Sequence, residues 1–224
     1  MIADEITSIE KPCELSEAQG RTLECIKKCI VMAIIPFKKA KSERNMGLKL
    51  NEKKLTQILV HQIQFQLMKI SSIIVNSEYS DVHFGTKGIP DFYFYYPADG
   101  KEYMPLFVVE SKRLPVPNNI KKREKEYVLG NANNGGIERF KKEIHGKHFY
   151  NCGMIGFVEK FTSSYWLNMI NTWIRNIAEI DPDWNDDEQL ELLEDTDDYC
   201  HLMSIVRRKI TGKNVLLYHW WIIC

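Results

Sequence analysis

Two short patterns place acidic and basic side chains where they could act on a phosphate ester. Glu110-Ser111-Lys112 follows the apolar run Leu-Phe-Val-Val at 106–109, and Asp91 opens an earlier run of apolar and aromatic residues. Side chains alternate along a strand, so Glu110 and Lys112 must project from the same face. Two converging carboxylates form a hard oxygen site of the kind that Mg²⁺ accepts, and a lysine beside them can orient or deprotonate a bound water. These residue types therefore indicate hydrolysis of a phosphodiester.

We expect the two runs to be neighbouring strands, over 89–96 and 103–111, joined by the turn-forming residues Pro-Ala-Asp-Gly-Lys at 97–101. So short a connection makes the strands antiparallel, and the start of the first then lies beside the end of the second. Asp91 is thereby brought next to the triplet that begins at Glu110. The competing interpretation is a hairpin whose polar end is merely solvated. An acid-x-Lys triplet occurs three times in the chain, and only this one ends a strongly apolar strand.

The remaining sequence indicates an α/β fold with a central mixed β-sheet flanked by helices. Apolar residues recur at helical spacing over 16–35, where Pro36 is expected to end the helix, and again after Asn51, a suitable helix cap. Further strands are expected at 73–75, 154–158 and 215–223, and further helices in the basic stretch that follows 119, up to Ile144, and after a cap at Ser163 or Ser164. We predict an N-terminal helical arm over 1–50 and one domain over 51–224.

Pro90-Asp91 and the triplet 110–112, with its apolar strand in front, resemble the motif of the PD-(D/E)XK, or restriction-endonuclease-like, nuclease superfamily. The expected order of elements over residues 51–160 is similar to the core of that superfamily, in which helices flank a mixed sheet.

The resemblance implies a role for each residue of the motif. Asp91 and Glu110 would bind Mg²⁺, with Mn²⁺ as a substitute, and Lys112 would assist the attacking water. The carbonyl of Ser111 is a further candidate metal ligand. Because family members often carry another acid on the first core helix, Glu52 is also a candidate; the alternative is a first-turn glutamate favoured by the helix dipole.

The formal net charge is zero, with 30 basic and 30 acidic residues, but the charges are segregated. Residues 181–198 hold ten Asp or Glu and no Lys or Arg, while residues 111–147 hold ten Lys or Arg against four Glu. A positive surface beside the hairpin would suit a nucleic-acid backbone, although such runs also occur as solvated helix faces. The residues that we expect to contact the backbone are Lys87, Arg113, Lys121, Lys122 and Arg123.

Cysteine and histidine patterns favour ordinary side chains over a zinc centre. His145, His148 and Cys152 lack the paired short spacing of a structural zinc site. Six scattered cysteines fit free thiols in a reducing compartment, and no apolar run approaches the length of about 18 residues that a membrane span needs. The N-terminus is acidic where a signal peptide would be basic. We therefore expect a cytoplasmic protein with no membrane partner.

Together these patterns predict a Mg²⁺-dependent endonuclease that acts on DNA, in restriction or phage defence, with RNA still open as a substrate. Many nucleases of the architecture that it resembles pair two subunits, so a homodimer is an option. The alternative is a non-catalytic nucleic-acid-binding or protein-interaction module that keeps the fold, with the acidic stretch 181–198 as a contact surface.

Overall fold

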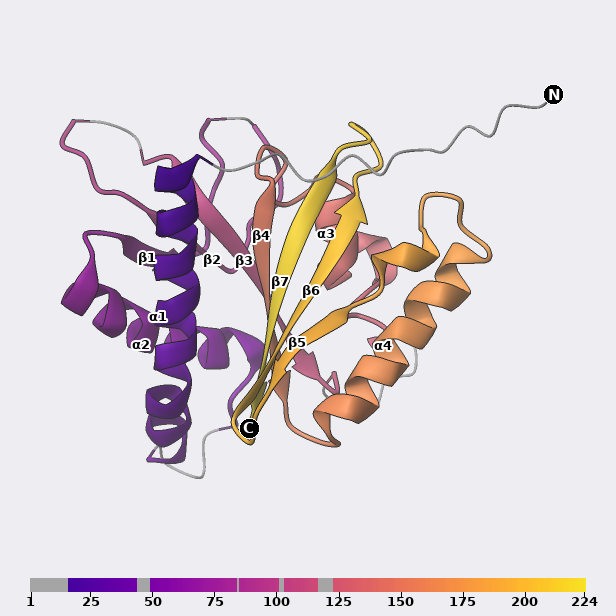
Figure 1. Ribbon diagram of the computed structural model, residues 1–224, viewed down its shortest axis with the longest axis horizontal. Helices are drawn as coiled ribbons and strands as arrows, with labels where there is room; N and C mark the ends of the chain where they lie inside the picture. Colours follow the sequence, from indigo (N-terminus) through magenta and orange to yellow (C-terminus); the bar gives the residue numbers. More distant parts are fainter. Residues whose placement is uncertain (1–15, 44–48, 84, 101–102, 117–122) are drawn as a thin grey trace.

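A computed structural model of the protein describes residues 16–43, 49–83, 85–100, 103–116 and 123–224. In this part of the chain seven strands form one sheet, in the order β1-β2-β3-β4-β7-β6-β5 (Figure 1). The strands are β1 (Ile74–Ser77), β2 (Phe92–Tyr95), β3 (Pro105–Leu114), β4 (Asn151–Val158), β5 (Glu191–Asp195), β6 (Tyr199–Arg207) and β7 (Asn214–Ile223). The α-helices are α1 (Glu17–Ser42), α2 (Glu52–Ile70), α3 (Gly136–Lys141) and α4 (Ser163–Ala178). β4 is parallel to both β3 and β7, and the other neighbouring pairs are antiparallel.

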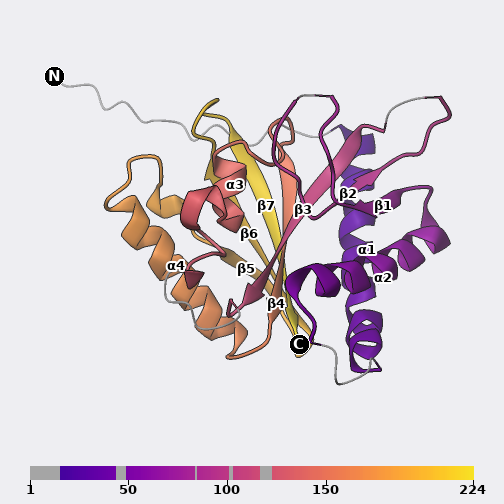
Figure 2. The same ribbon diagram turned by 180° about the vertical axis from the view of Figure 1, so that it is seen from behind.

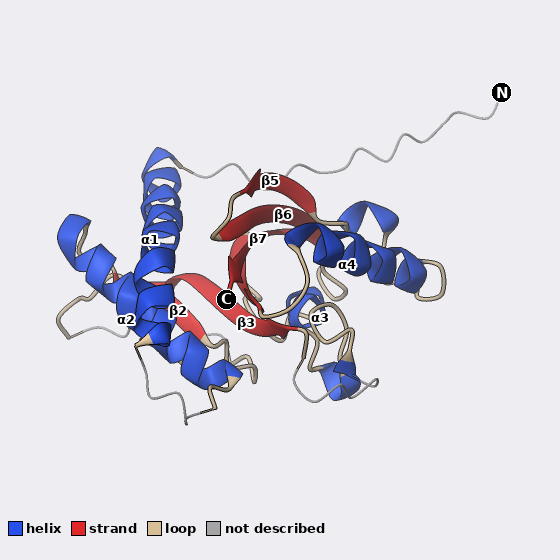
Figure 3. Ribbon diagram, turned by 90° about the horizontal axis from the view of Figure 1, so that it is seen from below, coloured by secondary structure: helices blue, strands red, loops and turns tan. Residues whose placement is uncertain are grey.

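Helices cover both faces of this sheet, as Figure 3 shows. α1 and α2 pack on one face, over a buried cluster that includes Phe107 and Val109 of β3. α3 and α4 lie on the other, where Val108 and Leu114 belong to a second cluster. The predicted α/β class, a mixed sheet flanked by helices, is therefore confirmed. Glu110 falls in the same alternation as Val108, so its side chain points toward the α3 face.

α1 runs through Pro36 to Ser42, so the prediction that Pro36 ends this helix was wrong. Ile34 and Phe37, on either side of the proline, are buried. The burial of this apolar face outweighs the one backbone hydrogen bond that proline cannot donate. α1 and α2 contribute to a single buried cluster, and the division of the chain at residue 50 stays a prediction.

Three of the helices, α1, α2 and α4, begin at side-chain caps, and the caps of α2 and α4 can be compared with the predictions. Asn51 caps α2 as predicted, because its side chain accepts the backbone N–H of Lys54 at 2.9 Å. Thr162, rather than Ser163 or Ser164, caps α4 by accepting the N–H of Tyr165 at 3.1 Å. The cap of α2 fixes the position of Glu52, which opens this helix.

The second half of the chain differs most from expectation. The basic stretch after residue 119 was predicted to be helical, but residues 124–128 form turns, and residues 120–122 lie outside the described residues. The next helix, α3, ends at Lys141 and not at Ile144 as predicted. β5 lies within the acidic stretch, and β6 was not predicted at all. Among the described residues, no helix is long and apolar enough to cross a membrane.

Candidate active site

The site lies where β3 extends beyond its partner β2. β2 begins at Phe92, opposite Val109, so residues 110–114 of β3 have no β2 residue beside them. Asp91 and Glu52 occupy this edge instead: Asp91 Oδ2 accepts the N–H of Ser111 at 2.7 Å, and Glu52 Oε2 accepts the N–H of Arg113 at 3.0 Å. Two carboxylates therefore take the place of a missing strand. Figure 2 shows the first turn of α2 beside this end of β3.

Glu110 is fully buried and faces three basic side chains. Its Oε1 accepts hydrogen bonds from Lys112 Nζ at 2.6 Å and from Arg139 Nη1 at 2.5 Å. Its Oε2 lies 3.2 Å from His145 Nδ1. Arg139 belongs to α3, and His145 follows it in the chain, so the α3 segment closes over the triplet from the second face of the sheet.

Lys112 lies at the centre of the group of carboxylates. Besides Glu110, its Nζ donates to the carbonyl oxygen of Ser111 at 3.0 Å and lies 3.6 Å from Glu52 Oε1. Burial alone would lower the pKa of Lys112, but Glu110, Glu52 and Asp91 together raise it above its ordinary value. Lys112 is therefore an ammonium at neutral pH, able to donate hydrogen bonds but not to accept a proton.

Their surroundings give the three acids of the site different pKa values. Burial would raise the pKa of Glu110, but the charge of Lys112, together with the neighbouring His145 and Arg139 side chains, outweighs burial and lowers it to about 2. Burial and the neighbouring Glu110 carboxylate raise the pKa of Asp91 to about 7. Burial also raises the pKa of Glu52, against the opposing effect of Lys112. Asp91 is therefore the carboxylate whose ionisation a further cation would favour most.

As a metal site, the cluster is incomplete in this conformation. No group of three or more His, Cys, Asp or Glu side chains within the described residues is placed to hold a metal ion. Glu110 Oε2 is nevertheless buried and lacks a hydrogen-bond partner among these residues. Because buried polar atoms usually have a partner, this oxygen is a candidate metal ligand. The Ser111 carbonyl, predicted as a ligand, accepts a hydrogen bond from Lys112. Oxygen ligands from two carboxylates, completed by water, fit the way proteins usually bind Mg²⁺.

The residues expected to contact nucleic acid are placed unequally. Lys87 is exposed, and Arg123 is exposed with its guanidinium on Glu126, at 2.7 Å. Arg113 is mostly buried, with its side chain 11% exposed and its Nε donating to Glu159 at 2.9 Å, so it is not free to bind a phosphate. Lys121 and Lys122 lie outside the described residues.

Part of the charge segregation seen in the sequence is neutralised by ion pairs in the folded protein. Lys141, counted in the basic stretch, is buried and donates to Glu188 of the acidic stretch at 2.5 Å. Lys209 pairs with Asp183, and Lys38 pairs with Asp198. The acidic stretch is thus partly an internal counterpart of basic residues elsewhere in the chain, which weakens the idea of a free acidic contact surface.

Sequence reasoning missed Arg139 as a member of the site and set His145 aside as an ordinary side chain. Neither residue belongs to a motif, and their approach to Glu110 depends on how α3 packs on the sheet. The one available signal is composition: Glu110 is a buried acid at the end of an apolar strand, and such an acid needs more than one basic partner.

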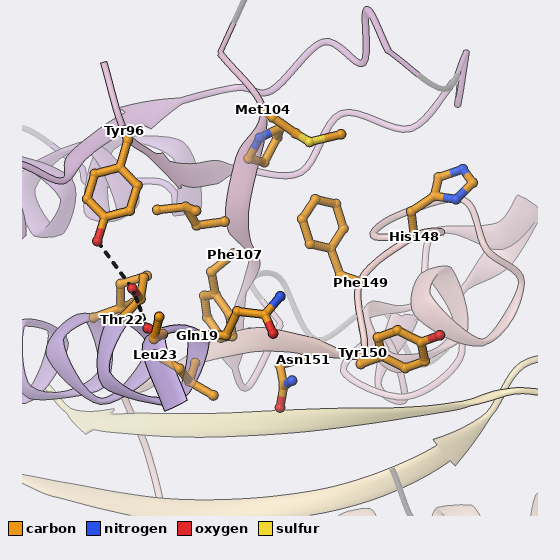
Figure 4. A pocket seen from close by; sticks show the side chains of 14 residues that line it. Gln19, Thr22, Leu23, Tyr96, Met104, Phe107, His148, Phe149, Tyr150 and Asn151 are labelled. Atoms are coloured by element: carbon orange, nitrogen blue, oxygen red, sulfur yellow. Dashed lines mark hydrogen bonds between the residues drawn. The ribbon is translucent and has the colours of Figure 1, made fainter. Parts of the chain in front are cut away.

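A well-formed pocket of the described structure lies elsewhere, at the opposite end of β3. It has a volume of about 470 Å³ and is mainly apolar, lined by α1, by Pro105–Phe107 at the start of β3 and by residues 148–151. Figure 4 shows Phe107 and Phe149 beside the space and the hydrogen bond between Tyr96 and Thr22 at its margin. The triplet does not line this pocket, and no described Asp, Glu, Lys or Arg side chain does. Glu110, Lys112 and Arg139 converge at the triplet instead, so the triplet is the better candidate for chemistry on a phosphate ester.

No protein-family model matches the chain, no curated protein matches its sequence and no solved structure matches it. The site must therefore be judged on its own geometry.

Proposed function

We propose that this protein is a divalent-metal-dependent nuclease that hydrolyses phosphodiester bonds of DNA at the Asp91, Glu110 and Lys112 site. One observation supports the proposal most: residues far apart in the chain, from α2, the start of β2 and the end of β3, bring three carboxylates around one ammonium at an open strand edge. The arrangement agrees with the restriction-endonuclease-like core that the motif resembles, which we propose as the parent fold.

Each side chain has a distinct part in the proposed reaction. Asp91 and Glu110 would hold Mg²⁺ or Mn²⁺, with Glu52 nearby as a third carboxylate. The cation, when bound, neutralises charge on the phosphate and lowers the pKa of water. Lys112, being protonated, would orient the attacking water and the phosphate by donating hydrogen bonds rather than act as a base. Arg139, whose guanidinium is partly exposed beside Glu110, would offer a second cation to the phosphate.

Partner and location follow as further parts of the proposal. Lys87 and Arg123 are the exposed basic residues, among those predicted, that could contact the DNA backbone. The described cysteines are all free thiols, as expected in the cytoplasm. A homodimer would allow both strands of a duplex to be cut, and size-exclusion chromatography with light scattering would detect it.

The test is cleavage of supercoiled plasmid, with single-stranded DNA and RNA run in parallel, in Mg²⁺, in Mn²⁺ and in EDTA. We expect nicking that requires the metal and that falls by about 10²-fold or more in Lys112→Met, since a positioned hydrogen-bond donor contributes on that order. Lys54→Met is the matched control, because Lys54 is an exposed lysine of α2.

A wild-type protein that binds DNA but cleaves no nucleic acid in either metal would contradict the proposal. That result would favour the non-catalytic binding module, in which the charged side chains around Glu110 only stabilise the packing of α3 on the sheet. Cleavage that survives Lys112→Met unchanged would also contradict the proposed site.

A further inference from the structure

Two buried atoms in the site lack hydrogen-bond partners and face each other. Glu110 Oε2 and His145 Nδ1 are both enclosed, and neither makes a hydrogen bond to any described residue. They lie 3.2 Å apart, a separation at which they can form a hydrogen bond only if Nδ1 carries a proton. When Nδ1 is unprotonated, both atoms are acceptors and neither can satisfy the other. We therefore treat the pair as a close contact that leaves both atoms unsatisfied.

Leaving two such atoms unpaired in the interior is costly unless something else satisfies them. A cation does so for both, because a carboxylate oxygen and an imidazole nitrogen are each electron-pair donors. Metal bonds of about 2.1 Å set roughly at right angles place two donor atoms roughly 3 Å apart, close to the separation seen here. The contact therefore has the spacing of two neighbouring ligands of one ion.

We propose that His145 Nδ1, together with Glu110 Oε2, binds the divalent cation of the site, and that this nitrogen ligand makes the site prefer Mn²⁺ to Mg²⁺. The inference rests on the proposed function, whose cation it specifies. Mg²⁺ prefers oxygen ligands and keeps its waters, whereas imidazole suits first-row transition metals. Two protein side chains and solvent would supply the initial ligands, and Asp91 would have to shift to join them, because the described residues form no three-ligand group in this conformation.

The position of His145 is fixed by packing, as a ligand's must be. Its side chain is only 1% exposed. Phe140 meets the ring edge-on, with ring centroids 6.0 Å apart, and a Cβ built on Gly88 would lie 2.3 Å from the imidazole Cδ2. The backbone N–H of His145 donates to the carbonyl of Arg139 at 3.1 Å. The imidazole is therefore held against Glu110 before any ion arrives.

Local charge also favours a cation. Once Asp91, whose pKa is raised to about 7, is ionised, the carboxylates of Asp91, Glu110 and Glu52 outnumber the permanent cations Lys112 and Arg139 that contact this group. A divalent ion would change the sign of the net charge, and a phosphate diester would then balance it. The site therefore accommodates metal and substrate together better than either one alone.

The test is pulsed electron paramagnetic resonance of Mn²⁺ bound to the full chain, which detects a directly coordinated nitrogen. We expect a ¹⁴N coupling in the wild type that is replaced by a ¹⁵N coupling when only histidine is ¹⁵N-labelled, a comparison that needs no mutation. The coupling should vanish in His145→Gln and persist in His148→Gln, which changes an exposed histidine of the same loop. By calorimetry, His145→Gln should weaken Mn²⁺ binding about tenfold or more and Mg²⁺ binding much less.

Absence of Mn²⁺ binding, absence of a histidine coupling, or a coupling that survives His145→Gln would each overturn the inference. Equal losses of Mn²⁺ and Mg²⁺ affinity would overturn the selectivity. The outcomes also separate the two proposals: metal-dependent cleavage without a nitrogen ligand leaves the proposed function standing, while a nitrogen-ligated ion without cleavage leaves the inference standing.

Discussion

Lys112, Glu110 and Asp91 could be brought together from the sequence because their spacing carries the information, whereas Glu52 was a candidate only through the family resemblance. Alternation along β3 places Glu110 and Lys112 on one face, and the short turn before β3 brings Asp91 beside them. Arg139 and His145 could not be predicted in the same way, since their contacts with Glu110 depend on the packing of α3 rather than on sequence spacing. The sequence therefore predicts the acids and the lysine of the site but only part of the basic shell around Glu110.

Arg139 provides a test at this scale. Arg139→Gln should lower the rate of metal-dependent DNA cleavage by about 10²-fold, because it removes a guanidinium that can bind the phosphate as negative charge develops. Arg139→Lys, which keeps the charge but not the forked geometry, should recover part of that rate. Stability should change little, since the Arg139 side chain is 24% exposed and Glu110 keeps Lys112 as a partner. Unchanged single-turnover rates in Arg139→Gln would rule out this role.

Among the elements, those with strong periodicity or a clear cap were predictable, and those decided by packing were not. β6 is an exception, since it was not predicted although Cys200, Leu202, Ser204 and Val206 alternate along it as buried residues. The end of α1 could not be found locally, because the burial of Phe37 beyond Pro36 depends on tertiary contacts. The acidic stretch concealed β5, whose five residues are all exposed and charged or apolar without alternation.

The segment before β2 tests how elements position the site. A Cβ at Gly88 would lie 2.2 Å from the carbonyl oxygen of Ile144 and against the His145 ring, so Gly88→Ala must push the two segments apart. We expect a loss of about 1–3 kcal/mol of unfolding free energy and weaker Mn²⁺ binding. Gly20→Ala is the control, because a Cβ at Gly20 in α1 meets nothing within 4 Å and should stabilise by about 0.5–1 kcal/mol. Chemical denaturation measures both, and equal stabilities for the two variants would contradict the packing described.

At the scale of the whole molecule, one sheet separates two buried clusters, and the second contains a polar network. Trp221 Nε1 donates to the Tyr127 hydroxyl at 2.9 Å, so that hydroxyl donates in turn to His219 Nδ1, also at 2.9 Å. His219 Nε2 must then carry the proton and donate to Ser204 Oγ at 3.0 Å. The chain of donors is satisfied only by a neutral imidazole.

Stability should therefore depend on pH through His219. Burial lowers the pKa of His219 to about 3 from 6.5, so the unfolded chain takes up this proton at a higher pH than the folded protein does. The contribution of the neutral His219 to the free energy of unfolding is complete above pH 6.5 and is lost as pH falls from there toward 3. His219→Gln should be less stable than the wild type by about 1–3 kcal/mol at pH 7. On acidification its unfolding free energy should fall less steeply than that of the wild type, and the two slopes should differ by up to ~1.4 kcal/mol per pH unit. Parallel curves for the two proteins, measured by urea unfolding at a series of pH values, would contradict this account.

The central claim, that Asp91 holds a metal for DNA cleavage, is tested most directly by single-turnover cleavage of plasmid across a Mn²⁺ titration. Asp91→Asn keeps an oxygen that can accept the Ser111 N–H but removes the charge that would bind the cation. Asp99→Asn, in the exposed turn at the other end of the hairpin, is the matched control. The account predicts a rate lower by about 10²-fold or more in Asp91→Asn and unchanged in Asp99→Asn. Equal rates in wild type and Asp91→Asn at every Mn²⁺ concentration would contradict it.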